Sequence, residues 1–367
     1  MNFNKLLNIN FLFLFIIFIL AIIGTAALYS AGDGNFNPWA KKHFIRFFVS
    51  FLILLIVVLI DIKIIYKHTY IIFFLSLILL LSVEIVGTFG KGAERWISIF
   101  GVSIQPSELI KVTLIMALAK YYNELRFDRI RKISNVFFPL IFISLPTALI
   151  ILQPDLGTSV TILLLGLSLM FIAGVRLWKF ILSFIILMIS FPFLWNNLKP
   201  YQQKRILSFF NPESDPMGQG YQLIQSKIAL GSGGLTGKGF LGGTQSYLKY
   251  LPEKQTDFIF TLIGEEFGFL GVIFIIILFF MLILIAIYIS IKSVHIFGRI
   301  LSMGIAINLF LYVVLNTSMV SGLMPVVGIP LPLISYGGTA MLSIMLSFGL
   351  LLNMELNFNS KKLNVRN

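Results

Sequence analysis

The chain has 367 residues, of which 58% are hydrophobic and only 12% are charged, and its mean hydropathy is +0.95. Soluble domains carry about 25% charged residues, so this composition indicates an integral membrane protein. The formal net charge of +13 is explained by membrane topology and attraction to anionic lipid, and we predict no nucleic acid partner. The absence of cysteine excludes disulfides, iron–sulfur clusters and thiolate zinc sites.

Apolar runs of roughly 17 to 25 residues, long enough to cross a hydrocarbon core of about 30 Å, follow one another along the chain. The short alternating segments typical of a membrane β-barrel are absent. We therefore predict an all-α integral membrane protein with about ten transmembrane helices. Their predicted ranges are 10–30, 43–62, 69–89, 107–123, 135–152, 157–174, 178–196, 257–290, 299–321 and 334–355.

Basic residues gather in one set of connections between these runs, which predicts that this set is cytoplasmic. Its members are Lys5, Lys63, Lys67, Arg126, Arg129, Arg131, Lys132, Arg176, Lys179, Lys292, Arg299, Lys361, Lys362 and Arg366. Both termini are then cytoplasmic, and the long polar segment 198–256 between helices 7 and 8 faces the outside. We predict a single membrane domain over 1–367 whose working surface lies in this loop, because loops carry chemistry while spans hold position.

Charged residues inside or beside the spans point to function, because each costs about 2.5–3.5 kcal/mol at mid-membrane. Glu108 and Lys111, in QPSELIK, are three residues apart on one helical face and can pair with each other. Asp155, in LQPDLGT, follows a proline at a span boundary, where helix capping competes with a substrate role. Glu265 and Glu266, in IGEEFG, are predicted to pair with a neighbouring helix.

Basic residues on the outer side suit a pyrophosphate or another anionic headgroup. They are Lys91 and Arg95 in GKGAERWI, and Arg205 and Lys227 in the long loop. Ordinary contact with lipid headgroups is the alternative. Both explanations stay open from the residues alone.

The glycine-rich segment 231–243 carries Lys238. A phosphate-binding P-loop is excluded, because Ser232 stands where that motif needs glycine and Gly239 where it needs Ser or Thr. The backbone can still approach a ligand closely, although a flexible connection explains the glycines equally well. Beyond it, Asp257 lies where the loop enters a long apolar helix, a position that simple capping would also favour.

Six stretches, in order along the chain, resemble the SEDS family of bacterial cell-wall proteins, which includes RodA, FtsW and SpoVE. They are GAERWI, QPSELIK, QPDLGTSV, NPESDPMGQGYQLIQSKIALGSGGLTGKG, LPEKQTDFIFTLIGEEFG and PLPLISYGGTAML. GTQS and QPDLGTSV are more similar to the elongation member, RodA, while the division-type FtsW stays an alternative. The resemblance implies a peptidoglycan glycosyltransferase that polymerises lipid II on the outer face of the bacterial cytoplasmic membrane and releases undecaprenyl pyrophosphate.

The resemblance also implies roles for individual residues and partners. The catalytic aspartate of the family's TDF motif falls on Asp257, preceded by Gln255 where similar sequences often have His. Its other important positions fall on Arg95, Glu108, Lys111, Asp155 and Arg205; together with Lys91, Lys227 and Lys238 these form our candidate substrate-binding set. The implied partners are a class B penicillin-binding transpeptidase and other elongation-complex membrane proteins.

The expected chemistry needs a base for the acceptor hydroxyl and positive charge for the leaving pyrophosphate, and Asp257 is the natural base for this inverting transfer. Binding of a divalent cation, Mg²⁺ or Mn²⁺, is an alternative role for Asp257, and no organic cofactor is expected. Two other functions compete. A lipid II flippase would use the intramembrane charges, and a scaffold for a transpeptidase would not need Asp257.

Overall fold

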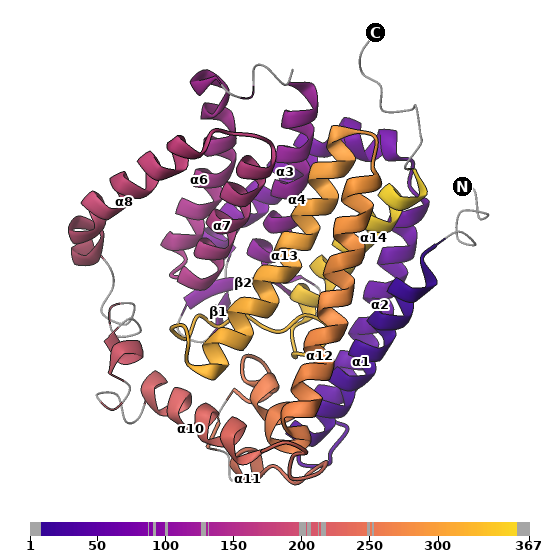
Figure 1. Cartoon of the computed structure of the whole chain (residues 1–367), viewed down its shortest axis with the longest axis vertical. Coiled ribbons are helices and arrows are strands. Elements are labelled where there is room, and N and C mark those ends of the chain that lie inside the picture. The colour runs from indigo at the N-terminus through magenta and orange to yellow at the C-terminus, as the bar shows by residue number, and fades with distance from the viewer. Residues whose placement is uncertain are drawn as a thin grey trace.

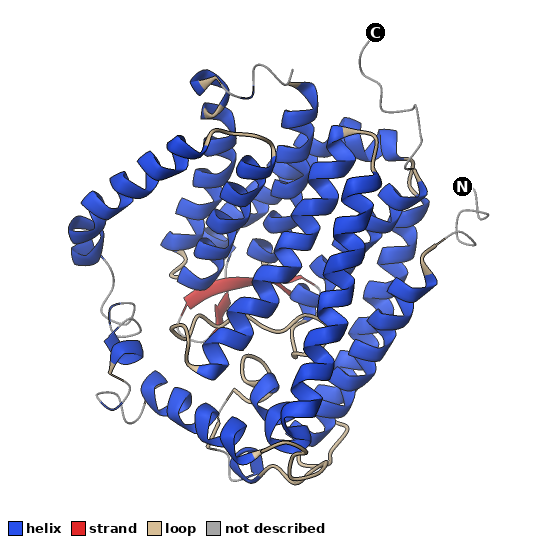
Figure 2. Cartoon of the chain, viewed as in Figure 1, coloured by secondary structure: helices blue, strands red, loops and turns tan. Residues whose placement is uncertain are grey.

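The computed structural model describes residues 9–86, 88–90, 93–99, 102–125, 130, 132–197, 203, 207–211, 213, 218–247, 250–251 and 253–357. Within these residues, long helices run side by side as a bundle, with short helices toward one end (Figure 1). Figure 2 shows that strands form only a small part of the fold. The mostly helical architecture agrees with the apolar runs in the sequence.

Each of the ten predicted helical ranges overlaps a helix of the bundle. These helices are α1 (Phe11–Ala31), α2 (Trp39–Leu59), α3 (Ile62–Val86), α4 (Pro106–Glu124), α6 (Phe137–Leu152), α7 (Leu156–Ile172), α8 (Leu177–Asn197), α12 (Ile259–Lys292), α13 (Ile296–Ser321) and α14 (Gly338–Leu356). Among the described residues, six helices are long and apolar enough to cross a membrane: α1, α2, α3, α12, α13 and α14. With its 16 residues, α6 is only about 24 Å long at 1.5 Å per residue. The count of ten spans therefore stays a prediction.

Large apolar side chains cover the outside of the bundle. Exposed examples are Phe15 on α1, Ile45 on α2, Phe74 on α3, Ile189 on α8 and Phe274 on α12. Water-soluble proteins rarely expose apolar patches of this extent, and lipid chains would cover them at no cost. The exposed surface supports the multi-pass membrane assignment that the composition indicates.

The all-α prediction is incomplete, because a small antiparallel sheet lies between α3 and α4. Its strands are β1 (Thr88–Gly90), β2 (Ala93–Ile99) and β3 (Val102–Ile104), in the order β1-β2-β3. The helix predicted to reach residue 89 ends at Val86. Glycines at 87, 90, 92 and 101 disfavour helix, and β-branched Ile97, Ile99, Val102 and Ile104 favour strands.

The central helix of the bundle is α4, which is buried along nearly its whole length. Its buried residues include small ones, such as Ala117 and Ala119, and the charged pair Glu108 and Lys111. A helix that is buried on every face belongs in the core of a bundle. Any charged group on α4 must therefore find partners on the helices around it.

The long polar loop folds against the start of α12 and contains α10 (Gln219–Ser232), α11 (Thr244–Tyr247) and the glycine-rich segment. Gly268 breaks α12 with φ 62° and ψ −161°, and backbone groups on either side of the break bond the glycine-rich segment instead. Lys238 N donates to Glu265 O at 3.1 Å, and Phe269 N donates to Gly234 O at 2.9 Å. The glycine-rich segment is thus held in the gap of α12 by backbone hydrogen bonds, rather than acting as a loose connection.

The first and last helices meet at the end of the bundle opposite α10 and α11 (Figure 1). Asn10, which caps α1, donates from Nδ2 to Glu355 Oε1 at 3.2 Å near the end of α14. The chain therefore starts α1 and finishes α14 at one end, as an even number of crossings requires.

Candidate functional site

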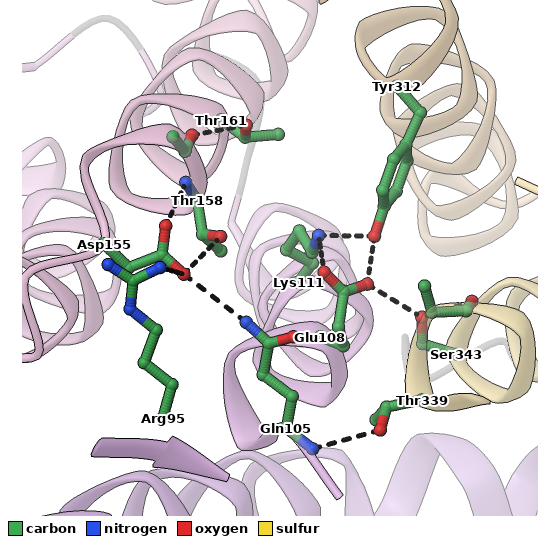
Figure 3. Close-up of polar contacts among 12 residues, drawn as sticks. Arg95, Gln105, Glu108, Lys111, Asp155, Thr158, Thr161, Tyr312, Thr339 and Ser343 are labelled. Carbon is green, nitrogen blue, oxygen red and sulfur yellow. Dashed lines mark hydrogen bonds and ion pairs between the residues drawn. The ribbon is translucent and has the colours of Figure 1, made fainter. Parts of the chain in front are cut away.

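The charged pair on α4 is contacted by two other helices. Pro106 starts α4, which puts Glu108 in the first turn and Lys111 one turn later. Lys111 Nζ lies 2.7 Å from Glu108 Oε1, and Glu108 and Lys111 are 4% and 2% exposed. Tyr312 from α13 donates its hydroxyl hydrogen to Glu108 and accepts from Lys111, while Ser343 from α14 donates to Glu108 (Figure 3). The predicted pairing is confirmed, and it links α4 to α13 and α14.

A second group forms where α6 turns into α7. Asp155 is the N-cap of α7: its carboxylate accepts from Thr158 N at 3.2 Å and from Thr158 Oγ1 at 3.0 Å. Arg95 Nη1 from β2 lies 3.8 Å from Asp155 Oδ2. Arg95 also donates to the carbonyl oxygens of Gln153 and Pro154. Capping is therefore a role that Asp155 does perform, alongside its ion pair with Arg95.

Gln105, just before α4, joins the two groups (Figure 3). Its Nε2 donates to Asp155 Oδ2 at 3.4 Å, and its backbone N donates to Thr339 Oγ1 at 3.1 Å. Thr339 lies in the first turn of α14, one turn before Ser343. Four residues predicted from the sequence, Arg95, Glu108, Lys111 and Asp155, are thus brought together around the start of α4.

Asp257 is half-buried and stands two residues before α12. The N-cap of α12 is Phe258, so Asp257 is not its capping residue. The backbone fixes its position: Asn316 Nδ2 from α13 donates to Asp257 O at 3.0 Å, and Ser335 Oγ donates to Thr256 O at 2.7 Å. The aspartate is thereby held at a defined point while solvent still reaches it.

The segment between α13 and α14 runs between Asp257 and the start of α7. A Cβ built on Gly328 would lie 3.4 Å from Asp257 Oδ2. A Cβ built on Gly157, in the first turn of α7, would lie 2.3 Å from the carbonyl oxygen of Val327. Because Val327 and Gly328 are consecutive, Asp257 and the group around Asp155 border one shared segment.

Two further basic candidates lie in the long loop. Lys238 Nζ is 2.8 Å from Glu265 Oε1 of α12, and the same oxygen accepts from Thr244 Oγ1 and Gln245 N. Lys227 is exposed on α10, with its Cε beside Gly322 at the end of α13. Lys91 and Arg205 lie outside the described residues.

The two adjacent glutamates of α12, Glu265 and Glu266, contact different parts of the protein. Glu266 accepts a hydrogen bond from Ser30 of α1, which agrees with the prediction that it pairs with a neighbouring helix. Glu265 instead pairs with Lys238 of the glycine-rich segment. Nearby, Lys254 Nζ bonds Asp33 Oδ1 at 2.9 Å and connects the segment before Asp257 to the turn after α1.

Sequence reasoning missed several residues that hold the site. Tyr312, Ser343 and Gln105 contact the charged groups across sequence separations that reach 235 residues, and nothing local marks them. Tyr312 looks like a core aromatic, and it is fully buried. A signal that could have found Gln105 is its place directly before Pro106, where a helix begins.

A metal centre made by the protein alone is not found in the described part of the chain. No three His, Cys, Asp or Glu side chains gather there. Mg²⁺ is commonly bound by one or two carboxylates together with substrate phosphates. A cation at Asp257 would therefore have to be held by this carboxylate together with substrate phosphates.

Comparisons with known proteins agree along nearly the whole chain. The family model for FtsW, RodA and SpoVE, described as a cell cycle protein, matches residues 4–360. The peptidoglycan glycosyltransferase MrdB of Escherichia coli (strain K12) is 42% identical over 285 residues, which cover 77% of this chain and 76% of the relative. An FtsW protein of Trichlorobacter lovleyi is 39% identical over 363 residues, covering 96% and 94% of the two chains.

Solved structures share the fold. A chain from a peptidoglycan synthase complex, described as coordinating polymerization and crosslinking, superposes with a TM-score of 0.83 at 28% identity, covering 96% of this chain and 99% of its own. A crystal structure of the Thermus thermophilus rod shape determining protein RodA gives a TM-score of 0.71 at 23% identity, covering 96% and 98%.

Proposed function

Because the chain belongs to the family of FtsW, RodA and SpoVE, we propose that it is a peptidoglycan glycosyltransferase that joins lipid II units into glycan strands. The observation that carries this proposal is the placement of Asp257. Asp257 is half-buried and precedes the N-cap of α12, and a Cβ built on Gly328 would lie 3.4 Å from its Oδ2. A partly exposed carboxylate at a fixed position can act as the general base for a reacting hydroxyl group.

In the proposed reaction, the acceptor hydroxyl oxygen attacks the anomeric carbon of the lipid-linked donor sugar. Asp257 takes the hydroxyl proton, the new C–O bond forms, and the pyrophosphate leaves with the electron pair of the broken bond. One displacement inverts the anomeric carbon and requires one base and no covalent enzyme intermediate. Such a base contributes about 10²- to 10⁴-fold to a rate.

Exposure separates the candidate basic residues into two kinds. The side chains of Arg95 and Lys238 are 23% and 27% exposed, so they can reach a bound pyrophosphate from their ion pairs. Lys227 is exposed and is assigned the same role, as are Lys91 and Arg205 outside the described residues. Lys111, whose side chain is 3% exposed, acts by fixing Glu108 and the start of α4. Asp155 and Glu108 shape the substrate pocket through these partners.

A divalent cation, Mg²⁺ or Mn²⁺, would be held by Asp257 and the substrate pyrophosphate, and it would supply charge for the leaving group. The protein residues position the sugars in either case. No organic cofactor is part of the proposal.

The orientation follows from the basic connections of the sequence. We assign ten spans in the bacterial cytoplasmic membrane, both termini in the cytoplasm, and the end that carries α10 and Asp257 on the outer face. The identities of 42% to MrdB and 39% to FtsW differ little, so the elongation role rests on the RodA-like GTQS and QPDLGTSV stretches. A class B penicillin-binding transpeptidase and other elongation-complex proteins are the proposed partners.

The test is polymerisation of fluorescent lipid II by the purified protein with its cognate transpeptidase, with and without a chelator. We expect glycan strands from the wild type and none from Asp257→Ala, with undecaprenyl pyrophosphate released. Loss of strands on chelation that Mg²⁺ or Mn²⁺ reverses would assign the cation. If neither protein makes strands while labelled lipid II still crosses proteoliposome membranes, the activity is that of a flippase.

A further inference from the structure

Arg46 is a charged residue within the first half of the apolar helix α2. It lies seven residues after the start of α2, about 10 Å along the helix axis. Its sequence neighbours Ile45 and Phe44 are exposed on the outside of the bundle, whereas His43 and Phe47 are buried. A charged side chain costs about 2.5–3.5 kcal/mol deep in a membrane, so its retention there calls for a compensating partner.

The described residues supply only a weak partner. The Arg46 guanidinium lies 4.6 Å from the centre of the Tyr336 ring. No carboxylate within the described ranges forms an ion pair with Arg46, and no atom there accepts a hydrogen bond from its guanidinium. A cation–π contact contributes about 0.5–2 kcal/mol and leaves the positive charge and its five N–H donors without an anion.

Arg95 and Lys111, two basic residues of the site that the sequence predicted, differ from Arg46 in having anionic partners within the protein. Arg95 donates to two carbonyl oxygens and pairs with Asp155, and Lys111 pairs with Glu108. Their donors are largely used within the protein. Arg46 keeps its donors available, with one face of its guanidinium steadied by an aromatic ring.

Arg46 and the residues that contact it are partly exposed. Arg46, Tyr336, Gly337 and Gly338 are all half-buried, while the flanking Ser335 is buried. A Cβ on Gly338 would lie 3.1 Å from the Arg46 guanidinium. A larger residue at position 338 would therefore crowd the arginine side chain. The guanidinium is therefore a partly exposed cation beside an aromatic ring and a glycine backbone.

The segment that contacts Arg46, residues 336–339, adjoins both parts of the candidate site. Tyr336 N donates to Gln255 O at 2.9 Å, two residues before Asp257. The residue after Gly338, Thr339, bonds Gln105 N, and Gln105 reaches Asp155. Arg46 thus contacts a segment that bonds both the stretch before the proposed base and the residue that reaches Asp155.

We propose that Arg46 binds the pyrophosphate of the lipid-linked sugar, as a further substrate-binding residue. This inference rests on the proposed function. A planar guanidinium can donate two parallel hydrogen bonds to phosphate oxygens. The N–H groups of Arg46 can form such a pair of bonds. Tyr336 acts as a positioning residue, because its ring fixes the plane of the guanidinium.

The experiment measures binding of undecaprenyl pyrophosphate to the full-length protein in nanodiscs, and separately kcat and KM for lipid II polymerisation. Arg46→Gln is compared with Arg46→Lys, with Gly338→Ala and with Lys42→Gln. Lys42 is a matched control, since it is exposed one turn earlier on α2. Phosphatidylglycerol and inorganic pyrophosphate are the competing anions.

Arg46→Gln is expected to weaken undecaprenyl pyrophosphate binding about 10- to 100-fold, as loss of a charge-assisted contact does. KM should rise more than kcat falls, Arg46→Lys should recover part of the affinity, and Lys42→Gln should bind as the wild type does. Gly338→Ala, which displaces the guanidinium, should weaken binding several-fold. If Arg46→Gln does not fold, the lysine and Gly338→Ala variants decide the question.

Unchanged binding by Arg46→Gln, or by Gly338→Ala when the first variant does not fold, would overturn the inference. Competition by phosphatidylglycerol as strong as that of undecaprenyl pyrophosphate would overturn it too, because Arg46 would then contact ordinary anionic lipid. The two proposals separate cleanly. Arg46-dependent binding without polymerisation by the wild type would refute the glycosyltransferase, and Asp257-dependent polymerisation with Arg46-independent binding would refute the role of Arg46.

Discussion

Two aspartates stand at the starts of helices, and their surroundings differ. Asp155 is 7% exposed, caps α7 through Thr158 and faces Arg95 at 3.8 Å. Asp257 is half-buried, precedes the N-cap of α12 and is placed through backbone bonds at Thr256 and Asp257. The Asp155 carboxylate caps a helix, whereas the position of Asp257 is set through backbone carbonyl oxygens. The comparison teaches that a carboxylate beside a helix start becomes a functional candidate once capping is accounted for.

Lys111, like Asp155, belongs to an ion pair that holds the fold together. Lys111→Met is expected to lower the free energy of unfolding by about 3–5 kcal/mol, because Glu108 stays buried without its cation. Reversible unfolding in mixed detergent micelles measures the change. The double variant Glu108→Gln, Lys111→Met should recover much of the loss. A single variant as stable as the wild type would show that the pair does not hold α4.

Asp155→Ala removes the cap of α7 and the partner of Arg95. We expect a loss of about 1–3 kcal/mol in the same unfolding assay, of which the cap accounts for about 0.5–2 kcal/mol. Asp155→Asn keeps an oxygen that can accept from Thr158 N and should lose less. Equal losses for the two variants would contradict the capping role.

Thr158→Val deletes one hydroxyl hydrogen bond to Asp155 and leaves the backbone bond in place. The expected loss is about 1 kcal/mol. Thr25→Val is the matched control, because the Thr25 hydroxyl bonds only the carbonyl oxygen of Ala21 in its own helix. If both variants lose the same stability, the Thr158 contact is not specific to the site.

Asp257→Asn should change the free energy of unfolding least, by no more than about 0.5 kcal/mol, because asparagine keeps the size of the side chain and the hydrogen bonds to the carbonyl oxygens of Asp257 and Thr256 remain. The same micelle assay checks it. A loss comparable to that of Asp155→Ala would mean that the Asp257 carboxylate is also structural, and the comparison would fail.

The sequence predicts the helices well, because a membrane imposes apolar runs whose length is fixed by the bilayer. It also identifies Glu108, Lys111 and Asp155, because charge in an apolar chain is conspicuous. It does not predict the sheet at 88–104, since its short strands lie within a region read as helix and loop. Long-range partners such as Tyr312 carry no local signal.

Arg46 is a second example of a residue whose contacts cannot be predicted from the sequence around it. In the sequence it stands between apolar residues and close to Lys41 and Lys42, which resemble ordinary interfacial charges. Only the fold places it against Tyr336 and beside Gly338, from segments almost three hundred residues away. The proposed role of Arg46 therefore depends on long-range packing, which the local sequence pattern does not predict.

The most direct test of the account is the rate of glycan strand formation per folded molecule for Asp257→Asn. Asp61→Asn is the control, an aspartate between α2 and α3 whose carboxylate accepts a hydrogen bond from Lys63 N. The account predicts a loss of about 10²- to 10⁴-fold for Asp257→Asn and wild-type rates for Asp61→Asn. A rate for Asp257→Asn equal to that of the wild type would contradict the assignment of Asp257 as the base.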